Sequence, residues 1–367
     1  MIVASMNSIP SRKETFKQTV RSILREQSCP VDRLHVYLYQ YQHIHSDLPQ
    51  DSRLEYHLEY PNAGPWARYI IADSLDDDDV LITIDDDTLY PSDYVATGLR
   101  ELNHFGKGTT VCFSGICWDP FADHYTYTED RWQSVSATAF ARHRIAAQQM
   151  GQTSFYWAKS VKKAINIAVP GFNTNDDMMM CYALQQRNIR VWCCPKSANW
   201  IQDLNTFNAP DALTQRDAQP RRQAFHDMVY KLGFDPSAGI LKEFLAKPRR
   251  ILVLADVCPP LAGSERLDES LRQLCAGDVS VHLLAIVPQS QAGPVQQYAT
   301  TPYEIHAVSV PEPGGRLDYL APVKAWRDWR VARGHRIKWN RRWKLAIERL
   351  QPTQVFVFRN GWLEAGA

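Results

Sequence analysis

Short apolar runs that alternate with helix-length amphipathic segments constrain this chain more than any other feature. The runs "IVASM" (residues 2–6) and "RLHVYLYQ" (residues 33–40) are typical of strands, and a helical pattern over about residues 12–27 separates them. "VLITI" (residues 80–84) is a continuous apolar run of the kind that parallel sheets bury. The alternation predicts an α/β fold with a Rossmann-like, mostly parallel sheet flanked by helices.

The chain of 367 residues is long enough for two domains, each with its own core. Strand signals weaken between residues 195 and 236, and a new strand-like run begins at "RRILVL" (residues 249–254). We therefore expect one domain over residues 1–247 and a second, smaller Rossmann-like α/β domain over residues 248–367.

Composition narrows the cellular setting and the class of partner. The net charge of +1 gives no reason to expect nucleic acid as a partner. The eight cysteines form no CxxC pair, which favours a reducing compartment over a disulfide framework. No apolar run approaches the roughly 20 residues that cross a bilayer, and no signal peptide opens the sequence. These patterns predict a cytoplasmic protein.

Two acidic runs flank the strand-like run at residues 80–84. The first acidic run (residues 76–79) precedes it and is typical of a solvated turn. The second, the acidic motif (Asp85, Asp86 and Asp87), follows the carboxyl end, where open parallel sheets bind ligands. Adjacent carboxylates repel unless a cation or hydrogen-bond donors compensate, and hard oxygen ligands suit Mg²⁺ or Mn²⁺. The motif therefore predicts a divalent metal site at Asp85 and Asp87.

The acidic motif resembles the Asp-x-Asp motif of bacterial family-2-like glycosyltransferases of the GT-A fold. Segments at residues 8–27, 62–72 and 172–192 resemble other parts of that family, in the same order. The resemblance covers about residues 1–195 and implies a GT-A-type fold. It implies an inverting, metal-dependent enzyme of bacterial surface polysaccharide synthesis, such as lipopolysaccharide or capsule. Its partners would be a nucleotide-sugar donor and a glycan or lipid-linked glycan acceptor.

The resemblance also implies roles for individual residues. Asp87, assisted by Asp85, would hold the Mn²⁺ or Mg²⁺ that stabilises the leaving diphosphate. It assigns contacts with the nucleotide sugar to six residues: Pro10, Ser11, Arg12, Arg68, Asp85 and Asp86. For the two arginines, an ordinary place on a helix surface remains open. Many GT-A enzymes add a downstream histidine ligand, but His226 lies far along the chain, so we expect Asp203 or water instead.

Asp176 and Asp177 stand at the predicted start of a helix. A carboxylate in the cleft is suited to take the proton of an attacking hydroxyl, and we assign this base role to Asp177. We expect Asp176 to cap the helix or bind the acceptor, although helix capping by either residue remains open. The aromatic run "FYWAK" (residues 155–159) predicts either a floor for the acceptor sugar or a buried strand.

Three other functions fit parts of the pattern. A haloacid-dehalogenase-like phosphatase carries a similar acidic motif, but Leu89 stands where that motif requires Thr or Val. A sugar nucleotidyltransferase would share the fold and the metal, yet its Gly-rich loop after the first strand is missing. A catalytically inactive glycan-binding or scaffold protein on the same fold remains open.

The second half resembles the amino-terminal half of a GT-B glycosyltransferase over residues 249–274, and its loop at residues 259–263 is no dinucleotide motif. We expect an incomplete GT-B half, either part of a longer two-transferase protein or a remnant that serves as a docking surface. Residues 324–344 are rich in Arg, Lys and Trp. They predict either a helix with a core-facing stripe or peripheral contact with the inner membrane.

Overall fold

A computed structural model of the chain divides into two compact units, which we describe separately. The first comprises Met1–Cys117 with Tyr125–Pro236, and the second comprises Trp118–His124 with Ser237–Ala367. The structure describes residues 1–58, 64–118, 124–127, 131–134, 139–140, 143–167, 175–204, 218–237, 249–255, 265–275, 279–288, 304–310, 344–359 and 362–365.

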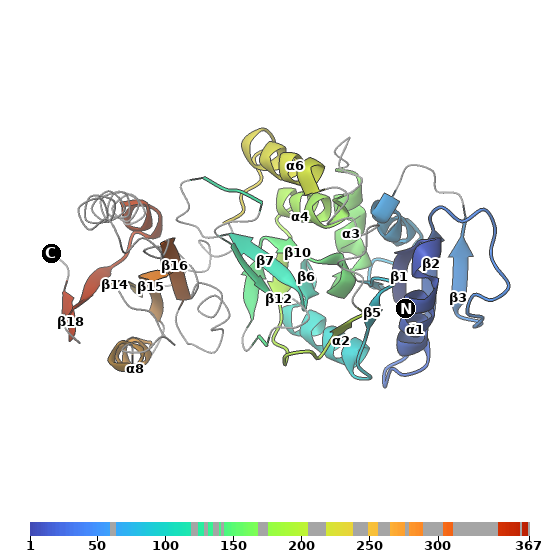
Figure 1. Ribbon diagram of the computed structural model, residues 1–367, viewed down its shortest axis with the longest axis horizontal. Coiled ribbons are helices and arrows are strands. Elements are labelled where there is room, and N and C mark those ends of the chain that lie inside the picture. The colour runs from blue at the N-terminus through green and yellow to red at the C-terminus, as the bar shows by residue number, and fades with distance from the viewer. Residues whose placement is uncertain are drawn as a thin grey trace, which may run out of the picture. The chain divides into compact units, whose positions relative to one another are not determined.

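An eight-stranded sheet forms the centre of the first unit (Figure 1). Its strand order is β3-β2-β1-β4-β11-β6-β12-β9. In chain order the bounds are β1 (Ile2–Ser8), β2 (Arg33–Leu38), β3 (Leu54–His57), β4 (Val80–Thr83), β6 (Thr109–Cys112), β9 (Arg144–Ala146), β11 (Ser154–Trp157) and β12 (Arg190–Cys193). Strands β1 to β4 are all parallel to their neighbours within that group, and the predicted α/β fold is confirmed.

Helix α1 (Lys13–Leu24) packs against this sheet because it presents an apolar stripe. On the first long helix, Phe16, Val20 and Ile23 recur at helical spacing and are buried against Ala4 and Val36 of the sheet. The helical segments of the unit are η1 (Pro10–Arg12), α1 (Lys13–Leu24), η2 (Gly64–Ser74), α2 (Tyr94–Phe105), η3 (Gly151–Thr153), α3 (Ala158–Ile165), α4 (Asp176–Gln186) and α6 (Ala218–Tyr230). Smaller sheets join β10 (Gln148–Gln149), β7 (Gly115–Trp118) and β8 (Arg131–Ser134), and join β13 (Gln202–Asp203) to β5 (Thr88–Leu89).

Strand β11 runs antiparallel to both of its neighbours, β4 and β6, which interrupts the otherwise parallel centre of the sheet. Because of this reversal, the start of β11 lies at the same sheet edge as the carboxyl end of β4, and Ser154 pairs with Thr83. The short segment η3 therefore lies beside the acidic motif.

The aromatic residues of β11 are part of the core. Phe155 and Tyr156 are both 0% exposed. A Cβ on Gly98 of α2 would lie 2.1 Å from Phe155 Cζ, so the helix approaches this ring as closely as a glycine allows. The interpretation of these two rings as an open floor for an acceptor sugar is wrong, since no face is free to stack on a sugar.

The first acidic run is a turn with Asp76, Asp77 and Asp78 exposed, as expected of a solvated turn, and ion pairs add to it. Asp77 lies 3.2 Å from Lys159 Nζ, and Asp78 lies 2.5 Å from Lys107 Nζ. Asp79 is only 5% exposed. This run anchors the amino end of β4 and stands apart from the acidic motif at the other end of the strand.

The second unit contains a five-stranded sheet in the order β16-β15-β14-β17-β18, parallel except for β18. Leu267 and Leu271 of its helix pack with Ile251 and Val253 of the sheet. The bounds are β14 (Arg249–Ala255), α8 (Glu265–Leu274), β15 (Val279–Pro288), β16 (Glu304–Val310), β17 (Gln354–Arg359) and β18 (Trp362–Ala365). The loop at residues 259–263 and the basic segment up to residue 343 lie outside the described residues, and the GT-B resemblance stays a prediction.

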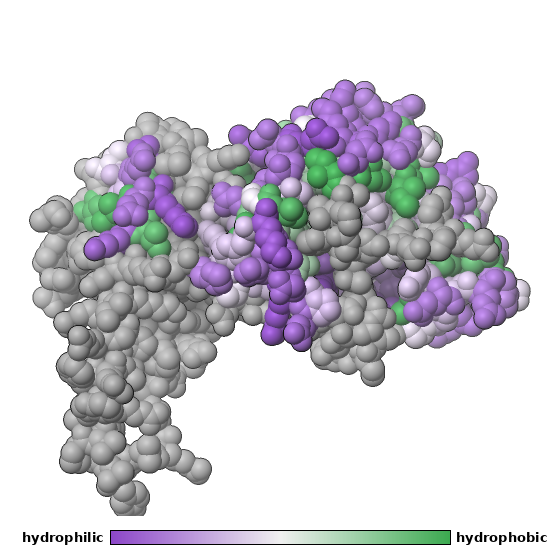
Figure 2. Space-filling view, turned by 90° about the horizontal axis from the view of Figure 1, so that it is seen from above, coloured by the Kyte–Doolittle hydropathy of each residue, from purple (hydrophilic) through white to green (hydrophobic). Residues whose placement is uncertain are grey.

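The described surface is mostly polar. In Figure 2, hydrophilic residues dominate the coloured part of the face shown, with small hydrophobic areas between them. The exposed large apolar side chains, such as Tyr39, Ile44 and Tyr230, are scattered along the chain. In the part of the chain that the structure describes, no helix combines the length and the apolar character that crossing a bilayer requires.

Candidate active site

The acidic motif lies at the carboxyl end of β4, where two guanidinium groups compensate its charge. Arg68 Nη1 lies 2.7 Å from Asp85 Oδ1. Arg12 Nη1 lies 3.3 Å from Asp86 Oδ1 and also pairs with Asp87. The side chain of Arg68 is 9% exposed and that of Arg12 is 18% exposed. Both arginines therefore belong to the site and are not ordinary helix-surface residues.

The central carboxylate of the motif is the most deeply buried. Burial raises the pKa of Asp86 to about 7, although the nearby Arg12 guanidinium works in the opposite direction. The backbone at this point is also fixed, because the buried Tyr90 hydroxyl accepts a hydrogen bond from Asp85 N at 3.0 Å. The same hydroxyl donates to Gln152 O at 2.7 Å and so ties the motif to η3.

Arg68 also joins the acidic motif to the start of α4. Its Nε lies 3.2 Å from Asp176 Oδ2, while its Nη1 contacts Asp85. Three segments that are distant in the sequence thus meet at one buried guanidinium group, and the predicted metal residues and predicted base lie in one site.

Asp177 is positioned by the loop before β11. Its Oδ1 accepts a hydrogen bond from Gly151 N at 2.8 Å. The N-cap residue of α4 is Asn175, whose side chain makes no capping hydrogen bond. Asp176 and Asp177 are the first two helical residues, so neither occupies the N-cap position that the capping interpretation required.

The environment of Asp177 favours its protonated form. Burial raises the pKa of Asp177 to about 8, the neighbouring Asp176 adds to the increase, and Arg68 opposes it. Burial also raises the pKa of Asp176. A carboxyl group with a pKa near the working pH can both accept and release a proton, which is the property that general acid–base catalysis requires.

Three residues of this site were missed by sequence reasoning: Gly151, Tyr90 and Arg221. A Cβ on Gly151 would lie 2.5 Å from Asp177 Oδ1 and 2.9 Å from Arg68 Nη1, so these two side chains would have to shift for any larger residue. Arg221 Nη2 of α6 lies 3.4 Å from Asn175 Oδ1. None carries a motif of its own: Tyr90 follows the acidic motif by three residues, whereas the fold alone brings Gly151 to Asp177 and Arg221 to Asn175.

The remaining predicted residues are placed as follows. Pro10 and Ser11 form η1 with Arg12, directly after β1, and both are exposed. Asp203 is exposed and pairs through its backbone with Thr88, the residue after the acidic motif. His226 is exposed on α6, where its ring lies against another aromatic ring.

The donor set at β4 has the chemistry that Mg²⁺ or Mn²⁺ prefers. Asp85 and Asp87 offer carboxylate oxygens at one strand end, and Asp203 pairs through its backbone with the next residue, Thr88. In the structure these carboxylates pair with separate arginines. Among the described residues, the clusters that place three potential metal-ligand atoms within 4.8 Å of one another do not include Asp85 or Asp87. The residues fit a hard divalent ion by type, and the ion would share its carboxylates with Arg12 and Arg68.

Comparisons with known proteins add likenesses of fold. No protein-family model matches the sequence, and neither does any curated protein. Among solved structures, S. aureus TarS is similar at 12% identity with a TM-score of 0.34, covering 54% of this chain and 36% of TarS. Another crystal structure is of TarS 1–349 in complex with UDP. This chain thus spans about a third of TarS.

Two other solved structures are similar at the same level of identity. A putative glucose-1-phosphate thymidylyltransferase from Bacillus anthracis has a TM-score of 0.33 at 12% identity, covering 60% of this chain and 94% of that one. The glycosyltransferase GlyE of Streptococcus pneumoniae TIGR4 has a TM-score of 0.29 at 12% identity, covering 84% of this chain and 80% of that one. With TM-scores below 0.5, these likenesses carry no argument about function.

Proposed function

We propose that the first unit is a metal-dependent, inverting glycosyltransferase that moves a sugar from a nucleotide-sugar donor to a glycan or lipid-linked glycan acceptor. The observation that carries this proposal is the double pairing of Arg68 with Asp85 and Asp176. It unites an acidic motif at a strand end with a carboxyl pair at a helix start. One half of this site suits a diphosphate and its cation, and the other suits an acceptor hydroxyl.

The two halves of the candidate active site would have separate roles in the reaction. The acceptor oxygen attacks the anomeric carbon as the bond from that carbon to the diphosphate oxygen breaks, and the electron pair leaves with the nucleoside diphosphate. Asp177 takes the hydroxyl proton. Arg12 and Arg68 supply positive charge beside the acidic motif, where charge develops on the leaving group. A Mn²⁺ or Mg²⁺ held by Asp85 and Asp87 would act as a Lewis acid on that diphosphate.

The biological setting belongs to the same proposal. We place the enzyme in the cytoplasm, where nucleotide sugars are made, and assign it to bacterial surface polysaccharide synthesis. Its second unit would bring it to the inner face of the cell membrane through the basic segment at residues 324–344. This setting rests on the sequence resemblance and on the composition of that segment.

The experiment is a screen of nucleotide sugars by thermal shift, with Mn²⁺ and with EDTA, followed by measurement of nucleoside diphosphate release. Ligand binding stabilises the folded state, so the correct donor should raise the melting temperature only when the ion is present. Asp87→Ala should abolish this metal-dependent shift without unfolding the protein, because it removes a ligand at a partly exposed strand end.

Asp78→Asn is the matched control, because it removes a carboxylate near the other end of β4 that pairs with the exposed Lys107. It should bind the donor as the wild-type protein does. If Asp87→Ala binds donor with undiminished Mn²⁺ dependence, the metal assignment is wrong. If no nucleotide sugar shifts the wild-type protein, the transferase proposal itself is wrong.

A further inference from the structure

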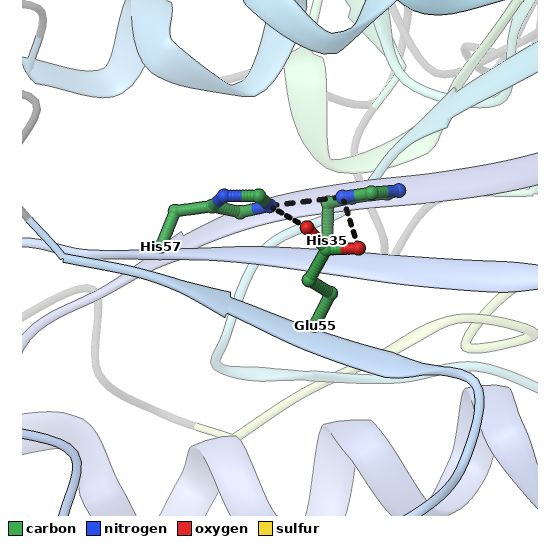
Figure 3. A group of neighbouring side chains, drawn as sticks. All are labelled: His35, Glu55 and His57. Atoms are coloured by element: carbon green, nitrogen blue, oxygen red, sulfur yellow. Dashed lines mark hydrogen bonds and ion pairs between the residues drawn. The ribbon is translucent and has the colours of Figure 1, made fainter.

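A cluster of two histidines and a glutamate lies on the edge of the main sheet, outside the candidate active site. Strand β3 is the edge strand, and it pairs in parallel with β2. The register places His35 opposite Glu55, and Tyr37 opposite His57. Because side chains two residues apart share a face of a strand, His35, Glu55 and His57 all project from the same face of the sheet (Figure 3).

The potential ligand atoms of these three side chains converge. His35 Nδ1 lies 2.9 Å from His57 Nε2. The Glu55 carboxylate oxygens lie 3.8 Å from His35 Nδ1 and 3.7 Å from His57 Nε2. Figure 3 shows the two rings facing each other edge to edge, with the carboxylate beside the gap between them. A tetrahedral zinc ion has ligand atoms about 2.0–2.1 Å away, and so roughly 3.4 Å from one another. The two carboxylate distances involve different oxygens, Oε2 and Oε1. The two nitrogens and one carboxylate oxygen lie within 4.8 Å of one another, so modest rotations of the three side chains would bring them to that spacing.

The surroundings hold the cluster in this arrangement. The ring of Tyr37 stacks on His57 at a centroid distance of 4.7 Å and fixes the plane of that imidazole. Ser5 of β1 pairs with His35, and its buried hydroxyl has no hydrogen-bond partner in the described structure.

We propose that His35 Nδ1, His57 Nε2 and the Glu55 carboxylate bind a zinc ion, with water as the fourth ligand. Two imidazoles and a carboxylate are a ligand set that zinc accepts, and the 57% exposure of the Glu55 side chain leaves room for the water. The ion would clip β3 to β2 and stabilise the edge of the sheet. This site is separate from the acidic motif and goes beyond the proposed glycosyl transfer.

A second group offers a comparison within the same protein. Glu101, His143 and Cys194 also place their ligand atoms within 4.8 Å of one another. His143 Nε2 bonds Glu101 Oε2 at 2.7 Å, as His35 Nδ1 bonds His57 Nε2 at 2.9 Å in the first group, so what sets this group apart is its thiol. Burial raises the pKa of the Cys194 thiol well above its usual range, which opposes the thiolate that zinc would require. We therefore use this group as the control.

The test is zinc titration of the full chain after dialysis against EDTA, followed by calorimetry and thermal unfolding. Wild-type protein should bind zinc and gain melting temperature on binding. His57→Gln and Glu55→Gln, both on the edge strand, should each weaken this binding at least tenfold and remove the gain. Co²⁺ in place of zinc should give the visible absorption of a tetrahedral nitrogen–oxygen site, and both variants should lose it.

His143→Gln should bind zinc as the wild-type protein does. The proposal is overturned if zinc does not bind, if binding survives both edge-strand variants, or if His143→Gln is the variant that loses it. Each of these outcomes leaves the glycosyltransferase proposal standing, because none of the three ligands belongs to the candidate active site.

Discussion

Asp177 combines two properties at the scale of one residue: a fixed position and a perturbed proton affinity. Its Oδ1 is held by Gly151 N, and burial raises its pKa to about 8. A base must be ionised to accept a proton, so turnover should rise with pH and level off above about pH 8. Below that, each pH unit should lower turnover about tenfold. A pH profile of nucleoside diphosphate release checks this, and a flat profile between pH 6 and 9 would contradict it.

Asp177→Asn should lower turnover roughly 10²–10⁴-fold while donor affinity changes little. The amide oxygen can still accept the hydrogen bond from Gly151 N. The substitution therefore keeps the position of the side chain and removes only its ability to take a proton. Steady-state rates with a donor titration give both values. Near-normal turnover would leave Asp177 with a structural role alone.

The same substitution should change how stability depends on pH. Because the pKa of Asp177 is raised on folding, the folded protein keeps a proton that the unfolded chain has released above about pH 4. The bound proton's contribution to the free energy of unfolding is fully present below about pH 4 and is lost as the pH rises through about 8. Asp177→Asn carries no ionisable group here and should lose less stability than wild type between pH 6 and 9. Urea unfolding at several pH values measures the difference.

Gly151→Ala should disturb the same carboxylate from the opposite side. The added Cβ would lie 2.5 Å from Asp177 Oδ1, so the carboxylate and the Arg68 guanidinium must shift. A displacement of about 1 Å at a reacting group can lower a rate roughly 10²-fold. Gln152→Ala is the control, because it shortens the next side chain and keeps the backbone carbonyl that bonds Tyr90. Equal activity of both variants would show that the contact tolerates movement.

At the scale of elements, the close packing of α2 on β11 supports the strand reversal that brings η3 to the site. Gly98→Ala places a methyl group 2.1 Å from Phe155 Cζ, and Gly98 and Phe155 are both buried. We expect a loss of about 1–3 kcal/mol in the free energy of unfolding, as overpacked cores show.

Urea unfolding measures this loss, with the exposed Arg100→Ala on the same helix as the control. Combining Gly98→Ala with Phe155→Leu should recover part of the loss, because the smaller side chain makes room. Wild-type stability in Gly98→Ala alone would mean that α2 can move away from the sheet at little cost.

The elements that the sequence predicted are those with local patterns. Strands β1, β2 and β4 have continuous apolar runs, and α1 has a stripe at helical spacing, so each could be predicted from its own residues. The direction of β11 depends on the strands beside it, and no pattern within the strand encodes that choice. The acidic motif could likewise be found as a strand end, whereas its pairing with Arg12 and Arg68 appears only when three segments are folded together.

At the scale of the whole molecule, every predicted site residue from Pro10 to Asp177 lies in the first unit. A fragment of residues 1–248 should therefore keep most donor hydrolysis or transfer activity. Circular dichroism checks that the fragment is folded, and nucleoside diphosphate release compares it with the full chain. A folded but inactive fragment would make the second unit part of the active site.

The reversal of β11 also has a consequence for the newborn chain on the ribosome. Strand β4 can pair with β1 as soon as it is made, but its other edge waits for β11, which is synthesised much later. An open apolar edge is a template for pairing with another chain and so for aggregation. Acidic residues stand at both ends of β4, and like charges repel a second copy that aligns along it. The two acidic runs would therefore act as gatekeepers at the ends of β4 until β11 is made.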